Sequence, residues 1–276
     1  MSGPAAATPD VGVAVITGGA SGIGLAFARA YAARGAHIVI GDIDETAMER
    51  ARAELAVTGT KVECVKVDLR DAGSVAHLGE IASGIGTLGA ICLNAGVTST
   101  GTAVWETSEE TYDFVVGVNL LGLFHSVKTF VPLLVAQGDS ADLVITASMA
   151  GMVASPYSAV YAASKAGAIA LAKSLRAELH MVAPAVRVAL LNPGMVKTNL
   201  IRTSAARLPS GSAMSDDLVK GGHDALNQIG VDPEVAVSWA LRALDDGTFW
   251  ALPAAGDPFA SMLDTELAEL HKVSSV

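Results

Sequence analysis

Short runs of apolar residues alternate along the chain with longer segments in which apolar and polar positions recur at helical spacing. The apolar runs predict strands over residues 11–17, 36–41, 62–67, 88–93, 141–147 and 185–191. The periodic segments predict helices over residues 23–34, 45–57, 72–82, 109–135 and about 158–181. Strands that are apolar throughout are buried on both faces. The alternation therefore predicts a doubly wound parallel α/β sheet with ligands at its carboxyl edge.

The domain organisation follows from the same pattern. No internal repeat or low-complexity linker divides the chain, which favours one domain over residues 11–276. Residues 1–10 contain neither a basic region nor an apolar stretch, so we expect a flexible N-terminal extension and no signal peptide. Residues 195–230, rich in Ser, Gly and Ala, interrupt the alternation and are expected to form an irregular substrate-binding loop or lid. A proline-containing helix start at residues 232–234 resumes it.

Composition narrows the class of partner. The 276 residues are 51% hydrophobic with a net charge of −10, which supports a large core and disfavours nucleic acid and anionic membranes as partners. Cys64 and Cys92 lie in apolar runs without a CxxC pair, which favours free thiols in a reducing, cytoplasmic compartment. The six histidines form no HxH or HExxH pair, so no metal site is indicated.

A glycine-rich turn, Thr17-Gly-Gly-Ala-Ser-Gly-Ile-Gly24, joins the first predicted strand to the first helix. Such glycines let the backbone approach a pyrophosphate, although similar turns also occur without a ligand. Asp42 follows 18 residues after Gly24, where a carboxylate would bind ribose hydroxyls and repel a 2′-phosphate. Neither the turn nor Ile43-Asp44 supplies an Arg or Lys, so the sequence favours NAD over NADP. Capping of the next helix is the alternative role, stronger for Asp44 than for Asp42.

A second constellation carries acid–base chemistry. Tyr161-x-x-x-Lys165 places a phenol and an ammonium one helical turn apart. Ser148 lies thirteen residues before Tyr161, at the end of a predicted central strand, and Asn119 interrupts an apolar helical stretch where an amide needs a partner. Tyr157 precedes Tyr161 by four residues but follows a proline, so we expect it to leave the helix and wall the substrate pocket.

Together these motifs resemble those of the short-chain dehydrogenase/reductase family. The resemblance covers residues 11–198 and rests on the glycine turn, Asp68, Asn94-Ala95-Gly96, Asn119, Ser148, Tyr161-x-x-x-Lys165 and Pro193-Gly194. It implies a Rossmann-type sheet of about seven strands, a nicotinamide dinucleotide cofactor and an active site at the carboxyl edge.

The resemblance also implies a role for each residue. Tyr161 would be the general acid/base, Lys165 and the positive nicotinamide would lower its pKa, and Ser148 would donate to the substrate oxygen. Asn119 would hold a water that links Lys165 to solvent. Asp68 would contact the adenine side or cap the next helix. The implied cofactor-binding residues are Thr17, Gly18, Ser21, Gly22, Ile23, Gly24, Asp42, Ile43, Asp68, Leu69, Asn94, Ala95, Gly96, Tyr161, Lys165, Pro193, Gly194, Val196 and Thr198.

The implied reaction interconverts a secondary alcohol and its ketone, and the NAD preference favours oxidation. The substrate pocket is expected to be mainly apolar, formed by Thr98, Met149, Val153, Tyr157 and Met195. Lys197 and Arg202 follow closely, which leaves an acidic substrate open. Two alternatives remain: a ketone reductase of a natural-product pathway, and a catalytically silent nicotinamide-binding regulator. The regulator is disfavoured because the tyrosine, lysine and serine are all present.

Two departures from the family pattern concern Leu93 and the C-terminal end. Leu93 replaces the first asparagine of the common Asn-Asn-Ala-Gly. Residues 247–259 lack the glycine-rich last strand of many members and are similar to members that act on benzylic alcohols of aryl compounds. Helices over 109–135 and 158–181 have apolar faces on both sides. In this family they pair between subunits, which implies a homodimer or homotetramer, with a monomer as the alternative.

Overall fold

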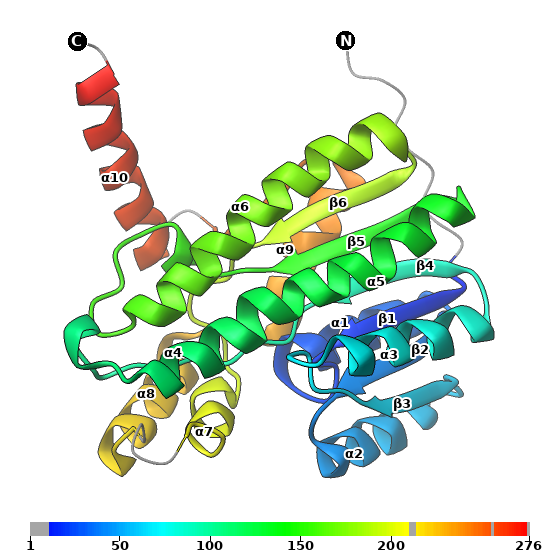
Figure 1. The fold of residues 1–276 in the computed structure, drawn as a ribbon, viewed down its shortest axis with the longest axis horizontal. Helices are drawn as coiled ribbons and strands as arrows, with labels where there is room; N and C mark the ends of the chain where they lie inside the picture. Colours follow the sequence, from blue (N-terminus) through cyan, green and yellow to red (C-terminus); the bar gives the residue numbers. More distant parts are fainter. Residues whose placement is uncertain (1–10, 210–213, 255–256, 275–276) are drawn as a thin grey trace.

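The computed structural model of the protein describes residues 11–209, 214–254 and 257–274, so the expected extension at residues 1–10 lies outside the described residues. A single sheet of seven parallel strands forms its centre, in the order β3-β2-β1-β4-β5-β6-β7. The strands are β1 (Val13–Thr17), β2 (His37–Asp42), β3 (Val62–Lys66), β4 (Leu88–Leu93), β5 (Ala141–Thr146), β6 (Val186–Leu191) and β7 (Trp250–Ala251). The expected Rossmann-type, doubly wound sheet is confirmed (Figure 1).

Helices cover both faces of this sheet. One face carries α1 (Gly22–Ala32), α2 (Glu45–Ala56) and α9 (Pro233–Asp245). The other carries α3 (Ala72–Ile85), α5 (Gly122–Gln137) and α6 (Ala159–Val182). The helix α4 (Glu109–Val116) continues through a π-helical turn at Gly117–Leu121 into α5, and 3-10 turns lie at Val104–Glu106 and Met149–Gly151.

The central strands are buried along their whole length, which explains why uninterrupted apolar runs predict them. Every residue of β1, β4 and β5 is buried, as parallel strands covered on both faces require. The edge strand β3 instead exposes Glu63 and Lys66. Each buried Val, Leu or Ile side chain contributes roughly 1.5–3 kcal/mol relative to an exposed one, so the central strands supply much of the folding free energy.

The strand order places a ligand crevice in a definite position. The chain builds outward from β1 through β2 to β3 and then returns to place β4 on the other side of β1. Crossovers on the two sides leave on opposite faces, which separates the loops that follow β1 and β4. The expected ligand edge therefore lies just beyond Thr17 and Leu93, which are paired in register.

The 195–230 segment differs from its prediction. Instead of being irregular, its described part contains α7 (Leu200–Ala205) and α8 (Asp216–Ile229), whereas residues 210–213 lie outside the description. Gly221 and Gly222 in the middle of α8 lower its intrinsic helix propensity, which misled the prediction. Tertiary packing overrides that penalty, because α8 buries Leu226 and is capped by Ser215.

A C-terminal helix, α10 (Pro258–Ser274), was also not predicted. Figure 1 shows it extending away from the sheet beside the start of α6. Its link to the rest of the fold includes Glu266, whose Oε1 accepts a hydrogen bond of 2.9 Å from the backbone of Ala154.

The continuous helix from Glu109 to Gln137 is long and apolar enough to cross a bilayer by length and composition alone, and it is the one such helix among the described residues. One side of it is buried within the fold, including Phe130 and Leu134. The other side exposes Leu121 and Phe124. An apolar helix with two apolar faces is also what a subunit interface requires.

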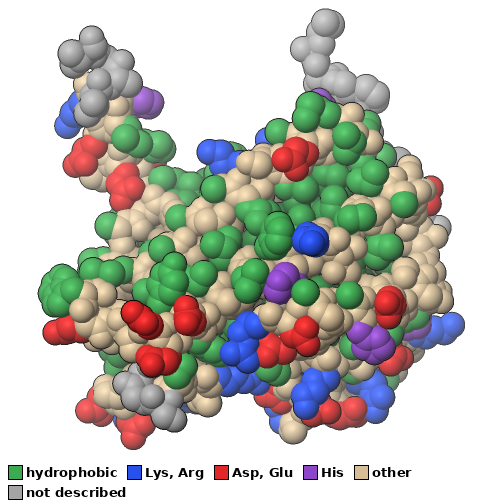
Figure 2. Space-filling view, in the orientation of Figure 1, with side chains coloured by type: hydrophobic (Ala, Val, Ile, Leu, Met, Phe, Trp, Pro, Cys, Tyr) green, Lys and Arg blue, Asp and Glu red, His purple; other side chains and the backbone are tan. Residues whose placement is uncertain are grey.

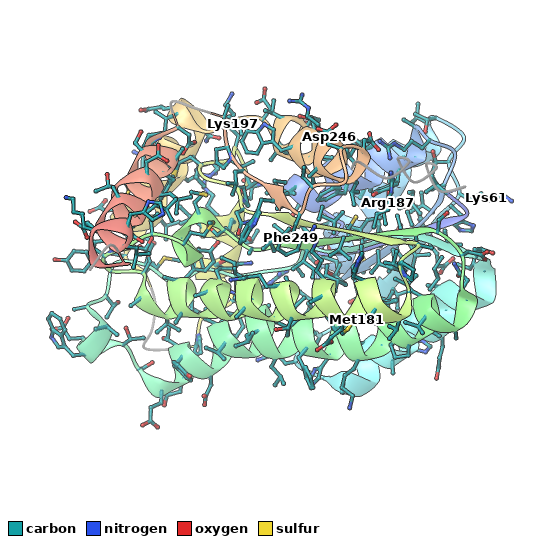
Figure 3. The ribbon with its side chains drawn as sticks, turned by 90° about the horizontal axis from the view of Figure 1, so that it is seen from above. Lys61, Met181, Arg187, Lys197, Asp246 and Phe249 are labelled. Carbon is teal, nitrogen blue, oxygen red and sulfur yellow. The ribbon has the colours of Figure 1, made fainter. Side chains whose placement is uncertain are left out.

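A buried ion pair links β5, β6 and two helices at the amino ends of the strands, opposite the expected ligand edge. Asp142 of β5 is fully buried, and its Oδ1 accepts a 2.8 Å hydrogen bond from Nε of Arg187 on β6. The hydroxyl of Tyr31 on α1 donates to the other oxygen at 3.1 Å. Nη1 of Arg187 also lies 3.3 Å from Asp245 at the end of α9, and Figure 3 shows Arg187 between the sheet and that helix.

We predict that Arg187→Leu lowers the free energy of unfolding by about 3 kcal/mol or more, because it leaves a buried carboxylate without its cation. Chemical denaturation would measure this change. Arg52→Leu is the control, since Arg52 pairs with Glu49 at the surface and should cost less than about 1 kcal/mol. Equal losses in the two variants would contradict the account.

Candidate active site

A cavity of about 300 Å³ lies at the carboxyl edge of the sheet, lined by residues that follow β1, β2, β4, β5 and β6. Most of the expected cofactor-binding residues line it. These are Gly18, Ser21, Gly22, Ile23, Asp42, Ile43, Asp68, Leu69, Asn94, Ala95, Gly96, Tyr161, Lys165, Pro193, Gly194, Val196 and Thr198. Thr17 and Gly24 do not line it and lie behind its wall. The topology thus brings together side chains from positions 18 to 198.

Thr17 and Gly24 support the glycine turn on the side away from the cavity, through hydrogen bonds and close backbone packing. Oγ1 of Thr17 accepts hydrogen bonds from the backbone of Asn94 at 2.9 Å and Ala95 at 3.2 Å, and Nδ2 of Asn94 donates to the Thr17 carbonyl at 3.3 Å. Asn94 therefore ties the end of β4 to β1. A Cβ on Gly24 would lie 2.0 Å from the Gly18 carbonyl oxygen, so only glycine permits this approach.

The turn has the form of a pyrophosphate cradle. Gly18 has a φ of +64°, and a Cβ there would lie 2.8 Å from Cα of Ala95. The turn leads directly into the N-terminus of α1, whose free backbone N–H groups and dipole favour an anion. These residues fit the phosphates of a dinucleotide.

Beyond β2, the two aspartates have separate tasks. Asp44 caps α2, because its Oδ1 accepts from the backbone of Ala47 at 2.9 Å. Asp42 lies on the cavity wall, and its two oxygens accept from the backbone N–H groups of Ala20 at 3.2 Å and Asp44 at 3.1 Å. These bonds fix the Asp42 carboxylate at the end of the cavity where a ribose is expected. The alternative assignment of the cap to Asp44 is thus correct.

Asp68 does not cap the helix that follows it, because Asp71 does so through the backbone of Gly73. Instead, Arg70 holds Asp68 through Nε–Oδ1 and Nη2–Oδ2 hydrogen bonds of 3.0 and 2.6 Å. This guanidinium lowers the pKa of Asp68, while burial opposes the shift. The guanidinium also lies 5.5 Å from the ring centre of Phe114, so an aromatic face and a charged pair form this wall.

Ser148, Tyr161 and Lys165 meet at the opposite part of the same cavity. Ser148 caps the 3-10 turn that follows β5, where its Oγ accepts from the backbone of Ala150 at 3.1 Å. Nζ of the buried Lys165 donates to the carbonyl of Thr146 at 3.2 Å and lies 5.8 Å from the Tyr161 ring centre. Helix α6 fixes the phenol and the ammonium one turn apart.

Burial sets the direction of the pKa shift at both Tyr161 and Lys165. Burial raises the pKa of Tyr161, and the hydrogen bond from Ser148 only partly opposes it. Burial also lowers the pKa of Lys165 from 10.5 to about 8. Burial thus governs the net shift at Tyr161, and the expected lowering by Lys165 together with the positive nicotinamide stays a prediction.

The buried Asn119 lies in the π-helical turn between α4 and α5. Its Oδ1 accepts from the backbone of Val97 at 2.8 Å, and its Nδ2 donates to the Val97 carbonyl and to Oγ of Ser164, both at 2.9 Å. Both amide hydrogens are thus used within the protein, so the amide cannot also donate to a water. Ser164 in turn donates to the backbone carbonyl of Tyr161 at 2.7 Å, which links the π-turn to Tyr161.

The five residues expected around the substrate do not line the cavity. Thr98, Met149 and Val153 are buried, and Met195 is half-buried. Tyr157 is 64% exposed and has a φ of +61°, which confirms that it lies outside helix α6. Lys197 and Arg202 do not line the cavity either, and Lys197 pairs with Asp232.

Several residues on the wall were missed by sequence reasoning. They come from α2, α4, the π-turn and the 195–230 segment, and they include Arg50, Phe114, Val118, Leu200, Thr203, Arg207 and Leu226. No spacing rule marks them, because the fold alone brings them to the cavity. The buried Oγ1 of Thr146, also on the wall, has no hydrogen-bond partner among the described residues. A ribose hydroxyl held beside Lys165 would give it one.

Within residues 11–209, 214–254 and 257–274, no group of three or more His, Cys, Asp or Glu side chains could hold a metal ion. A glycine cradle, a fixed ribose-side carboxylate and a serine–tyrosine–lysine cluster instead define the class: an α/β protein built to hold a dinucleotide beside acid–base groups.

Comparison with known proteins places the chain within this class. The family description "short chain dehydrogenase" matches residues 12–208, and the chain belongs to the short-chain dehydrogenase/reductase family. A 1-deoxy-11-beta-hydroxypentalenate dehydrogenase of Streptomyces exfoliatus is 40% identical over 73% of this chain and 74% of its own. A C alpha-dehydrogenase of a Sphingobium species is 30% identical over 87% and 80% of the two chains, which loosely matches the similarity expected at the C-terminal end.

A solved structure extends the comparison to the whole fold. A short-chain dehydrogenase/reductase of Burkholderia phymatum, in complex with NAD, superposes with a TM-score of 0.86 at 28% identity and covers 96% of each chain.

We predict that Lys165→Met stabilises the protein at pH 7. The pKa of Lys165 lies near 8 in the folded chain and at 10.5 when unfolded, so its burial costs about 3 kcal/mol below pH 8. Between pH 8 and 10.5 the unfolded chain binds more protons, so this cost disappears as the pH rises. Urea unfolding from pH 7 to 10 should show the advantage of the variant shrinking.

Lys173→Met provides the control, since Lys173 is exposed on the same helix. A Lys165→Met variant that is less stable at pH 7, or whose advantage does not change with pH, would contradict the burial argument.

Proposed function

We propose that the protein is an NAD-dependent oxidoreductase that interconverts a secondary alcohol and its ketone. One observation carries the proposal: the side chains of Ser148, Tyr161 and Lys165 share a single cavity with the glycine turn and Asp42. Oxidation of a secondary alcohol needs a dinucleotide that accepts a hydride from the carbinol carbon and a group that accepts the proton of the adjoining hydroxyl, and this arrangement supplies both sites. One proton acceptor and one hydride acceptor match the oxidation of a CH–OH group.

In the oxidation direction, Ser148 orients the substrate hydroxyl and Tyr161 accepts its proton. Because burial raises the pKa of Tyr161, the phenolate depends on nearby positive charge. Lys165, predominantly charged at pH 7 with a pKa near 8, provides one such charge. The nicotinamide, when bound, accepts the hydride and in its oxidised form adds a second positive charge.

Asn119 contributes through position. Its amide holds both backbone groups of Val97 and, through Ser164, the backbone of Tyr161. We assign it the task of fixing the acid/base residue against the cavity wall. A water that links Lys165 to solvent would have to be held by backbone carbonyls or by the remaining lone pair of the Asn119 oxygen.

NAD preference is the finer part of the proposal. The Asp42 carboxylate is held rigidly by two backbone N–H groups, so it cannot swing away from a 2′-phosphate. A carboxylate in that place attracts ribose hydroxyls and repels the additional phosphate of NADP.

The substrate we propose is an apolar secondary alcohol, with aryl alcohols to be tested first. The 195–230 segment, which we assign as the lid, adds Leu200 and Leu226 to the wall, and neither Lys197 nor Arg202 reaches it. Both curated relatives are named dehydrogenases, one of a hydroxylated natural product and one a C alpha-dehydrogenase. These names support oxidation over ketone reduction, and the complete serine–tyrosine–lysine set supports an active enzyme over a silent regulator.

We predict that Tyr161→Phe lowers kcat by at least about 100-fold on any secondary alcohol that the protein oxidises, because it removes the proton acceptor. NADH binding, followed by fluorescence, should change little. Tyr112→Phe, on the exposed side of α4, is the control and should keep its turnover. Normal turnover by Tyr161→Phe would exclude the mechanism.

We also propose that the protein assembles as a cytoplasmic homodimer or homotetramer. Exposed apolar side chains gather along α5 and α6, as Figure 2 shows on the face of the molecule that carries these helices. They are Leu121, Phe124, Val135, Met181 and Val182. Met181 lies near the end of α6, where Figure 3 labels it.

Light scattering after size exclusion should therefore give a mass of two or four chains. Phe124→Glu should shift it toward a smaller species, because it places a charge in the apolar interface. Val57→Glu, an exposed site at the end of α2, should leave the mass unchanged. A monomeric wild-type protein at micromolar concentration would contradict the assembly.

A further inference from the structure

Among the described residues, three arginines line the cavity, and each is held differently. Arg70 is committed to Asp68 by several hydrogen bonds. Arg50 projects from α2 and is exposed. Arg207, just beyond α7, reaches across the cavity so that its Nη2 lies 3.3 Å from Oδ2 of Asp44. That contact joins the 195–230 segment to the loop after β2.

The Asp44 contact places Arg207 at the ribose end of the cavity. The backbone N–H of Asp44 donates to Oδ1 of Asp42 at 3.1 Å, so the carboxylate that Arg207 touches adjoins the one expected to bind the ribose. Both aspartates and Arg207 line the wall. Neither the glycine turn nor Ile43-Asp44 carries a cation, so Arg207 reaches this end of the cavity through the fold alone.

Arg207 is free to exchange its partner, whereas Asp44 is not. The Oδ1 of Asp44 caps α2, which keeps that carboxylate in place whether or not Arg207 touches it. The side chains of Arg207 and Asp44 are 35% and 37% exposed, and such ion pairs are weak. A phosphate dianion within reach would compete well for the guanidinium, because charge-assisted bonds from arginine to phosphate are strong.

We infer that Arg207 is a cofactor-selectivity residue of the 195–230 segment. It supplies the cation of a latent 2′-phosphate site, which Asp42 keeps closed against NADP. With Asp42 present, Arg207 stays on Asp44, and the carboxylate of Asp42 repels the phosphate. Without the charge of Asp42, Arg207 moves from Asp44 to the phosphate. This inference rests on the proposed binding of a dinucleotide at this end of the cavity, but it requires no turnover.

The test uses two probes of the adenosine half, 5′-AMP and adenosine 2′,5′-bisphosphate, titrated calorimetrically into the full chain. The measured quantity is the ratio of the Kd for 5′-AMP to the Kd for the bisphosphate. This ratio should be roughly tenfold higher in Asp42→Ser than in the wild-type protein. Adding Arg207→Met should remove most of that gain.

Adding Arg202→Met to Asp42→Ser should keep the gain. Arg202 lies on α7 in the same segment, is exposed and does not line the cavity, so it matches the charge change without the contact. Asp42→Asn serves as a second background that preserves the shape of the side chain. Thermal unfolding would establish that each variant is folded.

Three results would overturn the inference: no gain in either Asp42 variant, a gain that survives Arg207→Met, or an equal loss from Arg202→Met. Failure of the proposed reaction gives a different result. In that case Asp42→Ser would gain affinity for the bisphosphate and lose it again with Arg207→Met, but the wild-type protein would oxidise no secondary alcohol.

Discussion

The ammonium of Lys165 is buried at the carboxyl edge of an apolar sheet, and the surrounding structure is arranged to hold it there. Its Nζ donates to the Thr146 carbonyl at the end of β5. Gly96 leaves room for it, since a Cβ at that position would lie 3.1 Å from Nζ and 3.3 Å from Oδ1 of Asn119. Burying this charge costs stability, and its pKa of about 8 expresses that cost. Active sites often carry such a cost because the chemistry needs the group in a dry place.

The rest of the site shares this constraint. Tyr161 lies one turn before Lys165, and its pKa is raised by the same burial. A half-buried phenol and a buried ammonium, each shifted toward its neutral form, are a pair whose charge state depends on what binds beside them. A positively charged cofactor ring would favour the phenolate, and that positive charge would be neutralised when the ring accepts the hydride. In the proposed mechanism, the ionisation of Tyr161 would therefore depend on whether the oxidised cofactor is bound.

The sequence was informative wherever local physics decides the structure. The fully apolar strands β1, β4 and β5 predicted a sheet covered on both faces. The four-residue spacing of Tyr161 and Lys165 corresponds to one turn of α6. The proline before Tyr157 correctly marked the residue that leaves the helix. These signals depend on neighbours in the chain, and tertiary contacts did not override them.

What the sequence did not reveal depends on distant contacts. Helix α8 was not predicted because Gly221 and Gly222 lower its helix propensity. The helix is stabilised by the burial of side chains such as Leu226. Arg207 reaches Asp44 across 163 positions, so no local pattern could place a cation at the ribose end. The direction of the pKa shift at Tyr161 likewise follows from burial, which spacing alone does not measure.

In the proposed reaction a hydride passes from the carbinol carbon of a secondary alcohol to NAD bound in this cavity. The most direct measurement is to incubate the protein and NAD with aryl and alicyclic secondary alcohols that carry deuterium at that carbon, and to analyse the cofactor by mass spectrometry. The account predicts NADH that carries one deuterium, formed in equal amount to the ketone. Failure to reduce NAD with any of these alcohols, or ketone formed alongside unlabelled NADH, would contradict it.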